Sequence, residues 1–280
     1  MSFISNCTAG AIKDAATSLI NGDLVAFPTE TVYGLGADAG NEMAVKKIYQ
    51  VKGRPSDHPL IVHISNLKQL DKWAREIPEY AIKLARSFWP GPMTLILPRT
   101  QLAKDFITGG RDNVGIRIPD QTLALALLTE FEKQGGMGVA APSANRFGKV
   151  SPTTAEHVLA DLGSEVDYIL DGGLCSIGLE STIVDCSAHS IQILRPGGIS
   201  RELISQVLPL SEQMTGPSRA PGMLEAHYAP TCRLTVVNDV NEAQSLLETQ
   251  IATQQVRIID GSSDPTLFAT QMYSQLRQCD

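Results

Sequence analysis

The chain has 280 residues, a hydrophobic content of 43% and a formal net charge of −7. This length and composition fit a globular protein of one large domain or two. The acidic balance excludes a dedicated duplex-binding protein, and no stretch reaches the roughly 18 apolar residues that span a membrane. The N-terminus lacks a basic region followed by an apolar run, and the five cysteines form no CxxC pair. We therefore expect a cytoplasmic protein with reduced thiols and no membrane partner.

Short apolar runs bounded by turn residues alternate along the chain with segments of helical periodicity. The expected strands are 24–27, 60–64, 93–97, 114–118, 138–141, 168–170, 181–185 and 191–194. The expected helices are 12–20, 41–51, 78–88, 121–133, 153–161 and 200–207. This alternation predicts an α/β fold with a twisted, mixed open sheet flanked by helices.

Proline, glycine and serine are dense in residues 209–230, and no hydrophobic period holds there, so we interpret this segment as a linker or lid. It separates a first domain at 1–208 from a partial, Rossmann-like α/β unit at 231–280. The elements expected in this unit are strands at 233–237 and 256–260 and helices at 241–252 and 265–277. Two strands and two helices are few for an independent domain. Either this unit docks on the first domain, or it is shorter than a complete domain of its kind.

Two common nucleotide-binding motifs match poorly. The P-loop pattern does not occur, because "GKV" at 148–150 lacks the following Ser or Thr. "GLGADA" at 34–39 fits a loose GxGxxA pattern, but it belongs to a stretch that we expect to be a loop rich in hydroxyls and glycines, and six residues (28–33) separate it from the preceding strand. The next strand also lacks the acidic residue of a dinucleotide site. A nicotinamide or flavin site is therefore disfavoured.

Polar loops follow the expected strands, and ligands of open α/β sheets bind where such loops converge. Lys52 and Arg54 in "KGRPSDHPL" would project to the same side if this segment were extended. The other loops add two arginines, several hydroxyls and an amide: Arg117, Arg195, Thr29, Thr31, Ser143, Ser151, Ser181 and Asn145. Such a set suits a polyanion such as a nucleotide phosphate, held by charge-assisted hydrogen bonds. No pair of residues has metal-ligand spacing, so no protein metal site is predicted.

The residues alone leave structural roles open. Lys52 and Arg54 could form a solvated helix end. His63 lies inside an apolar strand, where a histidine is usually a satisfied core residue. Ser143 and Asn145 could cap a turn.

Six motifs occur in order and favour functional roles for these residues: "FPTETVYGLGADA", "KGRP…PLIVHI", "WPGPMTLIL", "APSAN…GKVSPT", "DGG…GLESTIVD" and "LRPGGIS". Together they resemble the YrdC-like fold across about residues 12–207. The linker ending in "HYAP" and the unit after it are similar to the long, two-domain threonylcarbamoyl-AMP synthases, with a shortened C-terminal domain. That family condenses ATP, L-threonine and bicarbonate into threonylcarbamoyl-adenylate and pyrophosphate. A partner transferase then modifies the tRNA adenosine next to the anticodon.

The resemblance implies ATP as a substrate, Mg²⁺ held mainly by its phosphates, and at most a weak contact with tRNA. Lys52 and Arg54 would be catalytic, because fixed cations offset the charge that crowds the transferring phosphate. The implied ATP contacts are Arg54, His58, Asn113, Ser143, Asn145, Ser151, Arg195 and Tyr228. The implied L-threonine contacts are Thr31, His63, Arg117, the Ala141 backbone and Ser181. His58 stands where relatives often have asparagine.

Two other functions deserve a test. A YrdC-like module could bind RNA through a basic concave face without catalysis, and such binding would weaken steeply with salt. A related carbamoyl-transfer enzyme of hydrogenase maturation would add zinc-finger-like cysteines and an acylphosphatase-like part. Neither addition occurs in this sequence.

Overall fold

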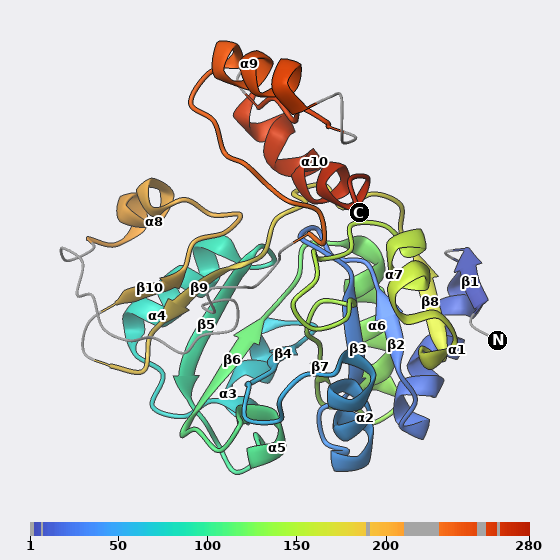
Figure 1. The fold of residues 1–280 in the computed structure, drawn as a ribbon. Coiled ribbons are helices and arrows are strands. Elements are labelled where there is room, and N and C mark those ends of the chain that lie inside the picture. Colours follow the sequence, from blue (N-terminus) through green and yellow to red (C-terminus); the bar gives the residue numbers. More distant parts are fainter. Residues whose placement is uncertain (1–2, 7, 189–190, 210–229, 251–255, 262–263) are drawn as a thin grey trace.

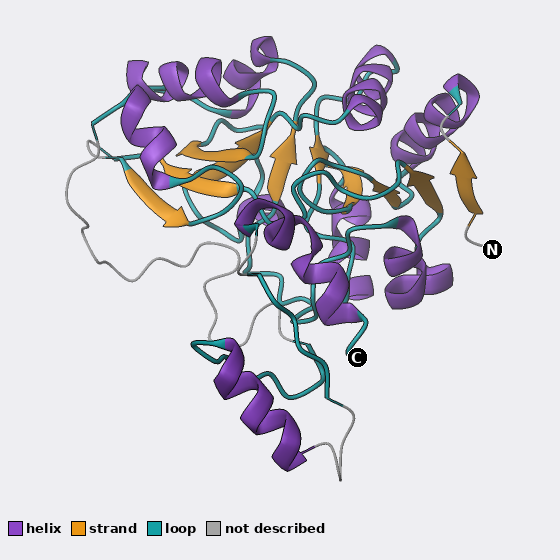
Figure 2. Cartoon of the chain, turned by 90° about the horizontal axis from the view of Figure 1, so that it is seen from above, coloured by secondary structure: helices purple, strands orange, loops and turns teal. Residues whose placement is uncertain are grey.

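The computed structural model describes residues 3–6, 8–188, 191–209, 230–250, 256–261 and 264–280 (Figure 1). Nearly all of the predicted linker, including Tyr228, lies outside these ranges. The described residues form one sheet of ten strands in the order β1-β8-β2-β3-β7-β4-β6-β5-β9-β10. Helices lie on both faces of this sheet (Figure 2). Within the described ranges, every helix is too short or too polar to cross a membrane.

Apart from β1 and β3, which were not among the expected strands, the strands and main helices of the first domain fall close to their predicted positions. The strands are β1 (Phe3–Asn6), β2 (Val25–Phe27), β3 (Gly34–Asp38), β4 (Ile61–His63), β5 (Met93–Pro98), β6 (Asn113–Arg117), β7 (Val139–Ala140), β8 (Tyr168–Asp171), β9 (Thr182–Asp185) and β10 (Gln192–Arg195). The main helices of the first domain are α1 (Ala9–Asn21), α2 (Glu42–Lys52), α4 (Glu79–Phe88), α6 (Thr122–Lys133), α7 (Ala155–Leu162) and α8 (Arg201–Val207). Two one-turn helices, α3 (Leu70–Trp73) and α5 (Asp105–Thr108), complete it.

The sheet is mixed, as predicted. β4 and β6 run parallel, and so do β5 and β9, whereas β7 pairs antiparallel with both β3 and β4. Successive residues of β2 face opposite cores: Val25 and Phe27 pack in the cluster beneath α1 and α6, and Ala26 packs in the larger cluster on the other face. The pairing of β4 with β6 places His63 beside Arg117.

One strand of this sheet was predicted as a loop. Residues 34–38, part of a glycine-rich run, form the buried strand β3. A Cβ on Gly36 would lie 2.9 Å from side-chain atoms of both Phe27 and Val139, so the close packing requires glycine. The glycines therefore mark a tightly packed strand here, and the loop prediction was wrong.

The local signals of α2 are confirmed, but the segment after it is not extended. The side chain of Asn41 accepts hydrogen bonds from the backbone N–H groups of Met43 and Ala44 and so caps the helix. Lys52 is the last helical residue, and Gly53, with φ of 63°, ends the helix in the left-handed conformation. Lys52 and Arg54 consequently do not project in parallel.

The C-terminal unit contains the two predicted helices, α9 (Val240–Gln250) and α10 (Pro265–Arg277). The two strands predicted at 233–237 and 256–260 are absent, since both described segments are irregular. Several of their apolar side chains, including Val236 and Ile258, are exposed, whereas Ile259 packs against the cluster that contains Tyr273 and Leu276. A two-stranded pair by itself is at best marginally stable, and neither segment joins the described ten-stranded sheet, which explains the difference.

Candidate active site

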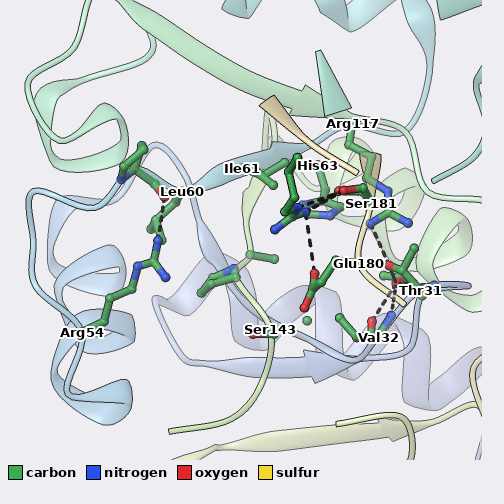
Figure 3. A pocket seen from close by; sticks show the side chains of 16 residues that line it. Thr31, Val32, Arg54, Leu60, Ile61, His63, Arg117, Ser143, Glu180 and Ser181 are labelled. Carbon is green, nitrogen blue, oxygen red and sulfur yellow. Dashed lines mark hydrogen bonds and ion pairs between the residues drawn. The ribbon is translucent and has the colours of Figure 1, made fainter. Parts of the chain in front are cut away.

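A pocket opens where loops following several strands of the sheet converge (Figure 3). Among the described residues, its lining includes eight of the predicted site residues: Thr31, Arg54, His63, Arg117, Ala141, Ser143, Ser181 and Arg195. Figure 3 shows Arg54 on one side and Arg117 on the other, with His63 and Glu180 between them. The strand ends thus bring together residues that are far apart in the sequence.

Arg117, the last residue of β6, is held rigidly on the side that faces the protein. It donates from Nη1 to Thr31 Oγ1 at 2.9 Å and from Nε to the carbonyl oxygen of Gly91 at 3.2 Å. Its Nη2 lies 2.6 Å from Glu30 Oε1, an ion-pair distance without the alignment of a hydrogen bond. Both side chains of this pair are about 5% exposed. The guanidinium is therefore pre-oriented at the pocket wall, which suits recognition of a carboxylate.

His63 provides a neutral polar group beside Arg117. Burial, reinforced by the charge of Arg117, lowers the pKa of His63 to about 3. The edge of its ring packs against Phe27, with ring centroids 6.0 Å apart. The imidazole is consequently uncharged at neutral pH and can accept or donate a hydrogen bond without adding charge to the pocket.

Arg195, the last residue of β10, and Ser181, just before the neighbouring strand β9, form a second polar cluster. Arg195 donates from Nε and Nη2 to the carbonyl oxygen of Ser181, and from Nη2 to Ser181 Oγ at 3.0 Å. Glu180 Oε2 lies 3.7 Å from Arg195 Nη2, and Ser151 donates to Glu180 Oε1 at 2.6 Å. Ser151 thus reaches the pocket only through Glu180, because it does not line the pocket itself.

Lys52 supports a neighbouring loop and does not line the pocket. Its ammonium donates at 2.6 Å to the carbonyl oxygens of both Ser143 and Asn145. Burial, together with the nearby charge of Arg54, lowers the pKa of Lys52 to about 7. Arg54 does line the pocket, where it donates to the carbonyl oxygen of Pro59 at 3.1 Å.

The remaining predicted residues occupy varied positions. The Asn145 side chain is buried and donates to the carbonyl oxygens of Arg146 and Lys149. The ring of His58 packs against Phe147, over which the Arg54 guanidinium also lies. Asn113 begins β6, at the end opposite Arg117, and donates to Ser187 Oγ at 3.1 Å. The N–H of Ala141 donates to the carbonyl oxygen of Ile61, so only its own carbonyl could contact a ligand.

Sequence reasoning missed two acidic residues of the site, Glu30 and Glu180. Of the described residues that line the pocket, only Glu180 carries a carboxylate, and Glu30 lies directly behind Arg117. Both stand inside the quoted motifs "PTETVYG" and "GLESTIVD", each next to a predicted site residue. That adjacency is the signal that could have found them. Within the described ranges, no cluster of three acidic, histidine or cysteine ligands is arranged for a metal.

Comparison with known proteins agrees with this architecture. The family model for the Sua5, YciO and YrdC proteins, described as "Telomere recombination", matches residues 17–197. The model of the threonylcarbamoyl-AMP synthase C-terminal domain matches residues 199–280.

Two relatives named threonylcarbamoyl-AMP synthase align with this chain over 233 residues. The protein of Pyrococcus abyssi is 46% identical, with 81% of this chain and 67% of the relative covered. The protein of Bacillus subtilis is 49% identical, with 80% of this chain and 66% of the relative covered. The chain thus spans about two thirds of the length of these relatives.

Solved structures of the same family are also similar to this chain. The structure of P. abyssi Sua5 complexed with L-threonine superposes with a TM-score of 0.89 at 37% identity, covering 100% of this chain and 89% of that one. E. coli YciO, at 21% identity and a TM-score of 0.61, shares the fold. The chain therefore belongs to the Sua5–YciO–YrdC family, in the form that carries the threonylcarbamoyl-AMP synthase C-terminal domain.

Proposed function

We propose that this chain is a nucleotidyltransferase that makes L-threonylcarbamoyl-adenylate from ATP, L-threonine and bicarbonate, with release of pyrophosphate. The observation that carries the proposal is the convergence of Arg54, Arg117 and Arg195 on one pocket. The names of the relatives and the L-threonine bound to the P. abyssi protein support the same substrates.

The wall around Arg117 suits the amino acid. Arg117 would bind the carboxylate of L-threonine through the part of its fork that faces the pocket. Thr31 and Ser181 offer hydroxyls, and the neutral His63 offers a further hydrogen bond without repelling the ammonium group. The Ala141 carbonyl oxygen adds an acceptor. These residues would fix the amine so that it can be carboxylated to a carbamate.

The rest of the pocket, from Arg54 to Arg195 beside Ser181, suits the nucleotide. Arg54, Ser143 and Arg195 would contact the phosphates. Four further predicted contacts, Ser151, Asn145, Asn113 and His58, stand outside the pocket lining, and Tyr228 lies outside the described residues, so their contact with ATP stays a prediction. The carbamate oxygen would attack the α-phosphorus and pyrophosphate would leave, while the fixed guanidinium groups offset the negative charge. Lys52 would act indirectly, by holding the 143–145 loop through its two hydrogen bonds. Mg²⁺ would arrive with ATP, because the one carboxylate of the described lining already accepts from Ser151.

The proposed product places the enzyme in a reaction sequence. A carbamoyl–phosphate mixed anhydride is a reactive acyl donor, so a downstream transferase would move the threonylcarbamoyl group to the tRNA adenosine next to the anticodon. We assign the chemistry to residues 1–208, with 209–230 as a lid and 231–280 as an accessory unit.

Pyrophosphate release tests the proposal, with L-threonine and bicarbonate each omitted in turn. We expect release only when both are present with ATP. Arg117→Lys should lose most of this activity, because an ammonium cannot replace the planar fork. Arg75→Lys, a change at an exposed arginine outside the pocket, is the matched control. RNA binding that weakens steeply with salt and needs neither substrate would instead favour a binding module.

A further inference from the structure

The last helix of the chain contacts the loop that carries Ser151. Arg277, in the final turn of α10, pairs with Asp161 through Nη2–Oδ2 at 2.5 Å and Nη1–Oδ1 at 3.2 Å. The same guanidinium donates to the carbonyl oxygen of Val150 at 2.5 Å and to that of Ser151 at 3.3 Å. The Arg277 side chain is 11% exposed and that of Asp161 is 8% exposed. This is a partly buried, multidentate contact in which one side chain holds two consecutive backbone carbonyls.

Apolar packing fixes α10 against the same loops. Tyr273 and Leu276 are buried in a small cluster with Val32 and Val150. The backbone of α10 also lies directly against Gly178, where an added Cβ would stand 2.2 Å from the carbonyl oxygen of Thr270. Figure 1 shows α10 lying over the loops at this edge of the sheet, whereas α9 lies farther out.

From Ser151 the contacts continue into the pocket. The Ser151 side chain is fully buried, and its hydroxyl donates to Glu180, which pairs with Arg195. Arg195 in turn donates to Ser181. An unbroken series of polar contacts therefore runs from the end of α10 to an arginine on the proposed nucleotide side of the pocket.

We propose that Arg277 is a positioning residue for the nucleotide side of the pocket. It fixes the backbone at residues 150–151, so that the Ser151 hydroxyl holds the Glu180 carboxylate beside Arg195. The arginine fork is needed because it satisfies Asp161 and both carbonyls at once, which a single ammonium cannot do. The identity of the ligand as ATP rests on the proposed function, whereas the contacts themselves do not.

Isothermal titration with ATP and with L-threonine, each measured separately, tests this role. Arg277→Ala should weaken ATP binding about tenfold, a loss typical of one or two hydrogen bonds. Threonine binding should weaken less than ATP binding, because Arg117 and Thr31 lie outside this series and only Ser181, at its far end, belongs to it. Arg277→Lys should bind ATP with an affinity between those of the wild type and Arg277→Ala. Asp161→Asn should weaken ATP binding less than Arg277→Ala does, because the contacts of Arg277 with the carbonyl oxygens of Val150 and Ser151 remain. Thr270→Ala is the matched control, since it removes a different contact of α10, the hydrogen bond to the Ser176 carbonyl.

Hydrogen–deuterium exchange of the same variants gives a second readout that needs no ligand. Arg277→Ala should speed amide exchange at residues 150–153 and 178–182 and leave β4 and β6 unchanged. Equal weakening of ATP and threonine binding, or unchanged exchange at these residues, would overturn the proposal. A wild-type chain that binds no ATP would contradict the proposed function, while the exchange data would still decide the role of Arg277. If Arg277→Ala does not fold, Arg277→Lys and Asp161→Asn decide both readouts.

Discussion

The buried pair of Glu30 and Arg117 allows a quantitative test. Arg117→Met removes the positive charge but keeps most of the side-chain volume, and so leaves the Glu30 carboxylate buried without a counter-charge. Two unit charges 2.6 Å apart attract by about 6 kcal/mol at an effective dielectric constant of about 20. Desolvation offsets part of this attraction, and removal of one partner of a buried pair typically costs about 3–5 kcal/mol. We therefore expect Arg117→Met to lower the free energy of unfolding by about 3–5 kcal/mol.

The double variant separates the charge from the packing. Adding Glu30→Gln to Arg117→Met removes the unpaired carboxylate and should restore about 2 kcal/mol of stability or more, while threonine binding stays lost. Urea denaturation of the wild type, both single variants and the double variant gives the coupling energy. The same cycle at Arg99 and Asp105, whose carboxylate is mostly exposed, should give less than about 1 kcal/mol. A Glu30–Arg117 coupling no larger than that of the exposed pair would refute the reasoning.

Three further predictions concern other contacts of the site. Burial lowers the pKa of Lys52 to about 7, so between about pH 7 and 10 the unfolded chain binds more protons than the folded chain, and the contribution of Lys52 to stability rises with pH. In urea denaturation, the difference in unfolding free energy between wild type and Lys52→Met should therefore grow by up to about 1.4 kcal/mol per pH unit over this range. A difference that stays constant with pH would contradict this prediction. Gly178→Ala should destabilise the chain by about 1–3 kcal/mol, because φ is 68° there and the new methyl group would meet the backbone of Thr270. An unchanged melting temperature of this variant would show that α10 does not pack against Gly178 as described. Arg54→Ala should weaken ATP binding by about 2–5 kcal/mol with little change in folding. The control Arg146→Ala changes a neighbouring loop outside the pocket lining and should leave ATP binding intact. If titration shows that both variants lose the same ATP affinity, Arg54 does not contact ATP in this pocket.

Local patterns predicted the first domain well because they report local physics. The cap at Asn41, the apolar spacing of α4 and the β-branched runs of β4 and β9 each depend on residues close in sequence. The convergence of strand-end residues also followed, since the order of strands and helices limits where loops can meet.

The errors concern features that depend on distant partners. Glu30 and Arg117 are 87 positions apart, so nothing local showed that the glutamate would be buried against an arginine. Lys52 was expected to point with Arg54, but the helix continues to Lys52 and directs its ammonium to carbonyls more than 90 residues away. The glycines of β3 look like a loop until Phe27 and Val139 are packed against them.

The two strands predicted in the C-terminal unit also failed because strands depend on distant partners. Residues 233–237 and 256–260 have the composition of strands, but a strand exists only with a hydrogen-bonding neighbour. Neither segment joins the described sheet, and side chains such as Val236 and Ile258 are exposed. The helices α9 and α10 satisfy their backbone groups internally, and both formed where they were predicted.

The central claim is that one pocket joins L-threonine, bicarbonate and ATP. Mass spectrometry of the reaction with [¹³C]bicarbonate tests it most directly. The account predicts a threonylcarbamoyl-adenylate that carries one ¹³C atom and forms only when all three substrates are present. A folded chain that binds both ATP and L-threonine but yields no ¹³C-labelled adenylate would contradict it.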